Sequence, residues 1–395
     1  MKRVVVVAAN LYRNLKAEID LLLEDWKEEG ADEVEIIKYP KGCAGSVTDL
    51  RDKLKSIEGI EGALLLGDLP VARMVDADMP NAPYETDYFF METQKQWTAT
   101  PKNIVRSNEY PPPTILTGRV ILGPETGFQM ANDKPSATEF YKSYLMKLHL
   151  YRWFNRLEEI PPEYRLQLKE IEKKALMIND LDDPNSRLNQ FCHLYQRGAI
   201  ESFSQVGKEL FLQLLASREV EWLWTLAHSG GNAQDLTDGS VINGCDYLNS
   251  KMFANFIQLE SCSIARFVWE DQWDPVNPGA LKLQSDPFVS NILFAPFCGV
   301  NVIGASASRA FPNVTQFFDQ VKTDKMVGLA FKKWMALQAA NNWSGGGRWM
   351  ILFGDPFIYR RYPRSIPRVR FEPKSSSPEF KKYLRSFVKW LKGRK

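Results

Sequence analysis

The sequence predicts an α/β fold in which a mostly parallel sheet is flanked by helices on both faces. Short apolar runs alternate with amphipathic helical patterns over most of the 395 residues. The apolar runs contain few polar residues, as is typical of strands that are buried on both faces. Strands separated by helices pair in parallel, because the helix carries the chain back to the edge where the first strand began.

The first elements alternate strictly along the chain. Residues 3–10 (RVVVVAAN) are expected to form a buried strand, because consecutive valines favour extended backbone. An amphipathic helix follows and ends at Gly30, a residue type that readily adopts the backbone conformation found just after a helix. The same alternation predicts a strand at 34–40, a helix at 46–56 and a strand at 62–70.

The rest of the chain continues this pattern. Further strands are predicted at 114–122, 174–180, 220–228, 255–262 and 299–308. Longer helices are predicted at 135–157, 200–217 and 314–340. We therefore expect three parts, namely an N-terminal α/β part, a second α/β part and a tail, over 1–165, 166–360 and 361–395.

The composition is that of an ordinary globular protein, with 44% apolar and 25% charged residues. No run of apolar residues is long enough to cross a membrane, so no transmembrane segment is predicted. The start, MKRVVVVAAN, has the basic residues of a signal peptide, but its valines suit a strand better than a helical signal core. We expect a cytoplasmic protein, or a secreted one if the start shown is a processed one.

The charge is divided unevenly along the chain. Residues 360–395 contain 13 Lys and Arg against 2 Asp and Glu, a charge of +11, and the preceding residues therefore carry −9 of the net +2. An acidic body argues against nucleic acid as a partner. The tail contains a basic amphipathic helical pattern, FKKYLRSFVKWLKGRK, which is expected to dock on the acidic body or on an anionic surface.

The cysteines and histidines predict neither a disulfide framework nor a metal site. The five cysteines are scattered and none lies in a C-x-x-C spacing: Cys43, Cys192, Cys245, Cys262 and Cys298. Such a pattern is typical of a reducing compartment. His149 and His193 lie on helical patterns, where histidines usually serve the surface or the core.

Three predicted strands end on residues that can carry chemistry. Three aspartates, Asp180, Asp182 and Asp183, lie in the segment 179–183, His228 precedes two glycines at 230–231, and Cys262 ends the strand that follows. In parallel sheets, ligands lie beyond the carboxyl ends of the strands. A lone cysteine is more often a core residue, but a nucleophilic thiol needs an imidazole at the same edge. Packing and chemistry are thus equally supported for Cys262 by these residues alone.

Five motifs in order resemble the gingipain-like family of caspase-fold (clan CD) cysteine peptidases. One is the strand ending in His228, followed after 34 residues by the strand ending in Cys262. The others are ALLLGDLP (63–70), ETDYFF (85–90), TGRVIL (117–122) and ILFGDPFIYR (351–360). The resemblance implies a caspase/gingipain-like sheet, with 166–360 as the catalytic subdomain.

The resemblance also implies a mechanism. Cys262 would be the nucleophile and His228 its base, and the backbone N–H groups of Cys262 and Ser229 would form the oxyanion hole. The reaction would be hydrolysis of a protein or peptide substrate through a thioester. The chemistry needs no cofactor or metal, although structural calcium is known in the family. Glu260 is a candidate for an acid that orients the site, since relatives carry an acid there.

Two features leave alternatives open. Ser229 replaces a glycine of the family and would be strained if the turn required positive φ, so the chain could instead be a catalytically inactive scaffold or regulatory binding protein. Asp180, Asp182 and Asp183 are candidates for a P1 pocket that selects Arg or Lys. The same Asp-Asp-Pro-Asn segment is equally typical of a solvated turn.

Overall fold

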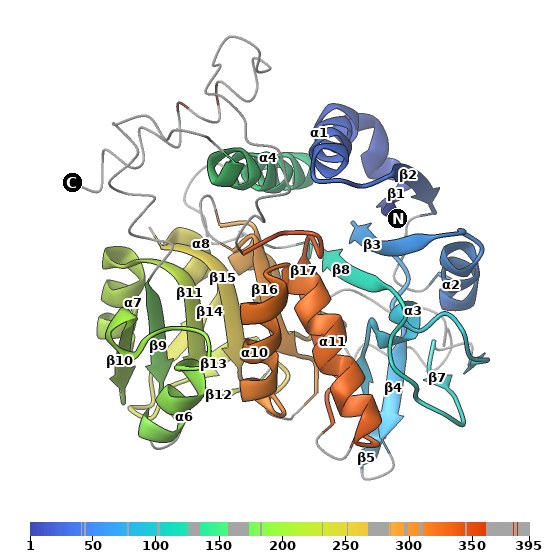
Figure 1. Ribbon diagram of the computed structural model, residues 1–395. Helices are drawn as coiled ribbons and strands as arrows, with labels where there is room; N and C mark the ends of the chain where they lie inside the picture. Colours follow the sequence, from blue (N-terminus) through green and yellow to red (C-terminus); the bar gives the residue numbers. More distant parts are fainter. Residues whose placement is uncertain are drawn as a thin grey trace.

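The computed structural model shows an α/β protein with a ten-stranded, mostly parallel sheet and helices on both faces, which confirms the predicted class (Figure 1). The described residues are 1–40, 42, 45–76, 79–100, 103–124, 126, 135–156, 174–181, 184–230, 232–250, 252–267, 284, 286–295, 299–307, 311–343, 346–360, 382 and 385.

The large sheet consists of two sets of parallel strands that run in opposite directions. The first set is β10 (Ile200–Ser204), β9 (Ala175–Asn179), β11 (Glu219–Leu226), β15 (Phe253–Glu260) and β16 (Asn301–Ala305). The second set continues the sheet with β17 (Met350–Gly354), β8 (Leu116–Val120), β3 (Ile60–Leu66), β1 (Lys2–Ala8) and β2 (Glu33–Tyr39). The sets meet where β16 and β17 pair antiparallel. The predicted site residues follow strands of the first set, whose carboxyl ends share one edge.

Three small antiparallel sheets accompany the large one. They are β12 (His228–Ser229) with β13 (Ala233–Asp235) and β14 (Val241–Asn243), β4 (Arg73–Asp76) with β5 (Met79–Glu85), and β6 (Thr98–Ala99) with β7 (Val105–Arg106). In Figure 1, β12 and β13 lie at the lower end of the first set of strands. This small sheet therefore lies at the edge at which the site was predicted.

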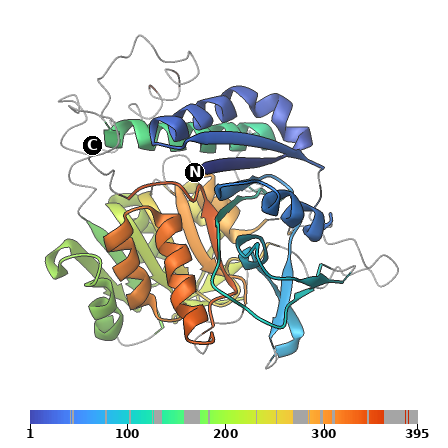
Figure 2. The ribbon, with the colours of Figure 1, turned by 45° about the vertical axis from the view of Figure 1, so that its right-hand side comes forward.

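Consecutive side chains of β11 show that helices cover both faces. The helices are α1 (Ala9–Glu28), α2 (Val47–Lys55), α3 (Tyr88–Met91), α4 (Ala137–Arg156), α6 (Pro184–Phe191), α7 (Lys208–Ser217), α8 (Gly244–Asn249), α9 (Phe288–Leu293), α10 (Val314–Asp324) and α11 (Val327–Ala340). Trp224 packs against Phe318 of α10, with ring centroids 5.3 Å apart. The next residue, Thr225, is linked through Gln234 to Tyr247 of α8. Since successive side chains point to opposite faces, α10 and α8 lie on opposite sides. α1 and α4 pack side by side (Figure 1 and Figure 2).

Two of the quoted motifs meet in a buried ion pair. Arg119 of TGRVIL is fully buried, and its guanidinium donates to the Asp87 carboxylate of ETDYFF at 2.7 and 3.1 Å. It also donates to the carbonyl of Pro70, at the end of ALLLGDLP, at 3.3 Å. A buried charge needs such a partner. Arg119 therefore joins β8 to the segments that contain Asp87 and Pro70.

The last motif has a similar structural role. Asp355 of ILFGDPFIYR is buried and accepts hydrogen bonds from Arg152 of α4 at 2.6 Å and from the indole N–H of Trp26 at 3.0 Å. The carboxylate thereby ties β17 to both helices of the α1–α4 pair. All three side chains are buried, so the charge of Asp355 is balanced inside the protein.

Two of the predicted helices differ from the observed structure. Residues 200–217 were predicted as one helix, but Ile200–Ser204 form the edge strand β10, whose backbone pairs with β9, and only Lys208–Ser217 are helical. Local propensity is overridden here by pairing with the sheet. The helix predicted at 314–340 is two helices, because Lys325 adopts a left-handed conformation with φ 63° between α10 and α11.

The predicted division into parts crosses a continuous sheet, since β17 pairs with β8. The boundary at 165 lies outside the described residues, and so does the tail, apart from Lys382 and Arg385. In the part of the chain that the structure describes, no helix has the length and apolar character needed to cross a membrane.

Candidate active site

The pairing of β11 with β15 brings together the strand ends that precede His228 and Cys262. The two strands are parallel neighbours, and the last pair of the ladder joins Leu226 to Glu260. His228 and Cys262 each follow two residues later, where His228 pairs with Asp235 of β13. Among the described residues, no hydrogen bond joins the His228 imidazole to the Cys262 thiol. The register of β11 with β15 could not be read from the sequence.

Two hydrogen bonds show that the segments stay together past the end of the ladder. The backbone N–H of Ala227 donates to the carbonyl of Glu260 at 3.3 Å. One residue after His228, the hydroxyl of Ser229 donates to the carbonyl of Cys262. The structure therefore brings together, at one edge of the sheet, the segments that contain the predicted nucleophile and the predicted base.

Both residues are at least partly exposed to solvent. His228 is exposed and Cys262 is half-buried. Within the described ranges, neither the imidazole nor the thiol has a hydrogen-bond or ion-pair partner, and the backbone N–H of Cys262 donates to no other group. Catalytic hydrogen bonds are often long before substrate binds. A free N–H beside the thiol is what an oxyanion hole requires.

The residue with a strained backbone near the candidate dyad is Ser263 and not Ser229. Ser229 is extended in β12, opposite Gln234 of β13, and does not have a positive φ. Ser263, directly after Cys262, has φ 55°. For a residue with a side chain this conformation costs roughly 1–2 kcal/mol. The hydrogen bond from its N–H to Ala307 at 2.8 Å holds Ser263 in place.

Glu260 is buried and forms an ion pair. Its Oε1 lies 2.9 Å from Nη1 of Arg187 in α6, and both side chains are largely shielded from solvent. The acid thus fixes α6 to the end of β15, two residues before Cys262. This contact supports a role for Glu260 in the geometry of the strand end.

Asp180 receives its hydrogen bonds from the fold. It is buried at the end of β9, and its carboxylate accepts the backbone N–H of Thr237 at 2.5 Å and the hydroxyl of the same residue at 3.0 Å. Its own N–H donates to Leu226 at 2.8 Å. Asp180 thereby ties β9 to β11 and to the turn after β13. The other two candidates for the P1 pocket, Asp182 and Asp183, lie outside the described residues.

Sequence reasoning missed a buried glutamine beneath the two strand ends. Gln234 is fully buried, and its amide bonds Thr225, Ser261 and Tyr247. Nothing in the sequence around it distinguishes it from a residue of a polar turn, because its partners come from three separate segments.

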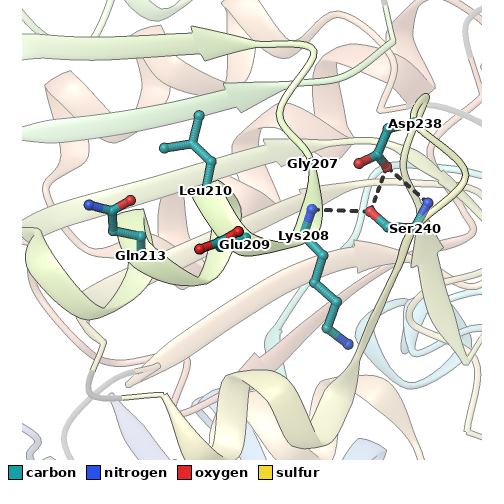
Figure 3. A pocket seen from close by; sticks show the side chains of 7 residues that line it. All are labelled: Gly207, Lys208, Glu209, Leu210, Gln213, Asp238 and Ser240. Carbon is teal, nitrogen blue, oxygen red and sulfur yellow. Dashed lines mark hydrogen bonds between the residues drawn. The ribbon is translucent and has the colours of Figure 1, made fainter.

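A shallow hollow of about 460 Å³ lies farther along the same edge (Figure 3). It is formed by the start of α7, which follows β10, and by the turn between β13 and β14. Its lining residues are Gly207, Lys208, Glu209, Leu210, Gln213, Asp238 and Ser240. The hydroxyl and the N–H of Ser240 donate to Asp238 at 2.5 and 2.9 Å and lower the pKa of that carboxyl. No residue of the candidate dyad lines this hollow.

The remaining histidines have acidic partners on helices. Nδ1 of His149 lies 2.9 Å from Asp25 and joins α4 to α1, and Nδ1 of His193 lies 2.9 Å from Asp319 of α10. Both contacts fit the structural roles predicted for them.

The other cysteines are not placed in a site. Cys245 is buried, which raises the pKa of its thiol, and Cys43 and Cys298 lie outside the described residues. Among the residues that can be described, no cluster of three His, Cys, Asp or Glu side chains could hold a metal, so no residues are assigned to the calcium that the resemblance implies.

Comparison with models of known protein families finds no match, and no curated protein matches the chain.

Proposed function

We propose that the chain is a cysteine endopeptidase with a caspase/gingipain-like fold, in which Cys262 and His228 form the catalytic dyad. The observation that carries the proposal is the contact between the Ser229 hydroxyl and the Cys262 carbonyl, which joins the segments that contain His228 and Cys262 beyond the paired strands β11 and β15. The resemblance of five motifs and the parallel strands of the first set support it.

The mechanism is acyl transfer. The Cys262 thiolate attacks the peptide carbonyl, and the oxyanion that forms accepts hydrogen bonds from the backbone N–H groups of Cys262 and Ser229. The C–N bond then breaks, and His228 protonates the departing amine. Water, deprotonated by His228, attacks the thioester, which releases the acid and returns the thiol.

The choice of substrate follows from the acids near the strand ends. Cleavage after Arg or Lys is proposed because Asp180, Asp182 and Asp183 follow β9, the neighbour of β11. The carboxylate of Asp180 is held by Thr237, which makes Asp182 and Asp183 the better candidates for contact with a cation. The free cysteines suit a reducing compartment such as the cytoplasm.

Turnover of a fluorogenic peptide library with Arg or Lys before the reporter tests the proposal. Wild type should cleave it, Cys262→Ala should not, and Cys192→Ala should behave as wild type, because Cys192 is also a half-buried free cysteine. Equal turnover by wild type and Cys262→Ala would contradict the dyad. Absence of turnover under reducing conditions, with and without calcium, would favour the non-catalytic scaffold or regulator.

A further inference from the structure

One buried side chain contacts both strands that carry the candidate dyad. Nε2 of Gln234 donates to the hydroxyl of Thr225 in β11 and to that of Ser261 after β15, each at 3.0 Å. Oε1 accepts the phenol hydroxyl of Tyr247 in α8 at 2.9 Å. Gln234 is fully buried, so both of its N–H donors and its carbonyl are used inside the protein.

The partners of Gln234 lie next to the proposed catalytic residues. Ser261 immediately precedes Cys262, and Thr225 lies three residues before His228. Through its backbone, Gln234 pairs with Ser229, the residue that follows His228 and bonds the Cys262 carbonyl. A shift of this one amide would therefore displace the two segments relative to each other.

From these contacts we infer that Gln234 is a positioning residue, which sets the spacing of Cys262 and His228 without touching the substrate. The inference rests on the proposed function, because it assigns a role within the same dyad. Buried polar networks of this kind are rigid when every member is bonded. A displacement of about 1 Å at a reacting pair can lower the rate roughly a hundredfold.

A second buried glutamine separates positioning from a general effect on stability. Gln338 of α11 is also fully buried, and its amide accepts from Asn313 at 2.8 Å and donates to Gln316 at 3.1 Å. Gln338→Leu removes a buried amide and its two partly buried hydrogen bonds on a helix that contains no residue of the proposed dyad. It is therefore the matched control for Gln234→Leu.

The experiment compares Gln234→Leu, Ser261→Ala, their double variant and Gln338→Leu, below the melting temperature of each. Gln234→Leu should lower kcat about 10- to 100-fold and leave KM within about threefold. Gln338→Leu should leave both constants close to those of wild type. The double variant should be no slower than Gln234→Leu alone, because both changes break the same link.

Alkylation of Cys262 by iodoacetamide, followed by mass spectrometry, adds a readout that does not depend on peptide turnover. The rate of this reaction measures the nucleophilic reactivity of the Cys262 thiol, which an adjacent imidazole raises. Gln234→Leu and His228→Ala should both slow this reaction relative to Cys192 in the same molecule. If Gln234→Leu does not fold, Ser261→Ala, which removes only one hydroxyl, tests the same link.

The outcomes distinguish the role of Gln234 from the existence of the dyad. Slower alkylation in His228→Ala, with Gln234→Leu and Ser261→Ala unchanged, would overturn the role of Gln234 and leave the dyad intact. Equal alkylation in wild type and His228→Ala would remove the dyad and, with it, the role of Gln234.

Discussion

The buried Arg119–Asp87 pair allows the strongest prediction about stability. Arg119 makes three N–H contacts of 2.7 to 3.2 Å with Asp87, and both side chains are buried. The guanidinium also lies 5.5 Å from the ring centre of Phe267, which follows Cys262 in the chain. Arg119→Met keeps most of the side-chain volume at this position but leaves the charge of Asp87 without its partner.

The expected loss is large. Removing one member of a buried pair costs about 3–5 kcal/mol, which is a sizeable part of a total stability of about 5–15 kcal/mol. For a chain of this size the melting temperature should fall by roughly 3–10 °C, at about 1–2 °C per kcal/mol. Differential scanning calorimetry of wild type and Arg119→Met measures this change directly.

Two further variants make the prediction specific. Arg119→Met with Asp87→Leu should recover most of the loss, because an apolar pair of similar volume is often as stable as a buried ion pair. Arg218→Met breaks the exposed contact with Glu201 and should cost less than about 1 kcal/mol. A loss in Arg119→Met no larger than that in Arg218→Met would refute the reasoning.

Three other changes have expected outcomes. Gly118→Ala should lower the free energy of unfolding by about 1–3 kcal/mol, because the new Cβ would lie 2.1 Å from the carbonyl oxygen of Gly354. A Cβ at Gly198 would have nothing within 4 Å, so thermal melts should find Gly198→Ala neutral or slightly stabilising. Ser263→Gly should keep or slightly raise the melting temperature, because glycine adopts φ 55° without the cost that serine has there, and Ser263→Val should lower it, because a branched residue is excluded at this φ. Hydrogen bonds from Ser240 hold the pKa of Asp238 below its ordinary value of 3.8. The contribution of Asp238 to the stability of the folded protein is therefore present above pH 3.8 and is lost as the pH falls through the pKa of the folded state. In thermal melts from about pH 3 to 7, the melting temperature of Asp238→Asn should decline less on the acid side than that of wild type.

The sequence was sufficient to predict the strands with continuous apolar runs. The valines of β1 are fully buried, and β9, β11 and β15 lie within one or two residues of their predicted bounds. Such runs predict strands reliably because burial on both faces excludes polar residues. The edge strand β10 was missed, since its five residues gain their conformation from pairing with β9 rather than from their own pattern.

The reversal of direction at β17 was also beyond sequence reasoning. It depends on which strand the chain pairs with after α11, a long-range choice that local periodicity does not record. The residues that follow β11 and β15 could be named as candidates, because they end recognisable strands. The buried amide of Gln234 that joins the two strands could not be named, because its contacts are also long-range.

The central claim is that Cys262 and His228 act as one unit, and labelling with a peptidyl chloromethyl ketone that carries Lys next to the reactive group tests it most directly. The peptide positions the reagent as a substrate, so an activated thiol displaces chloride much faster than an ordinary one. Mass spectrometry should find the adduct on Cys262 and not on Cys192, and His228→Ala should slow its formation by about a hundredfold or more. Labelling of both cysteines at similar rates, unchanged in His228→Ala, would contradict the claim.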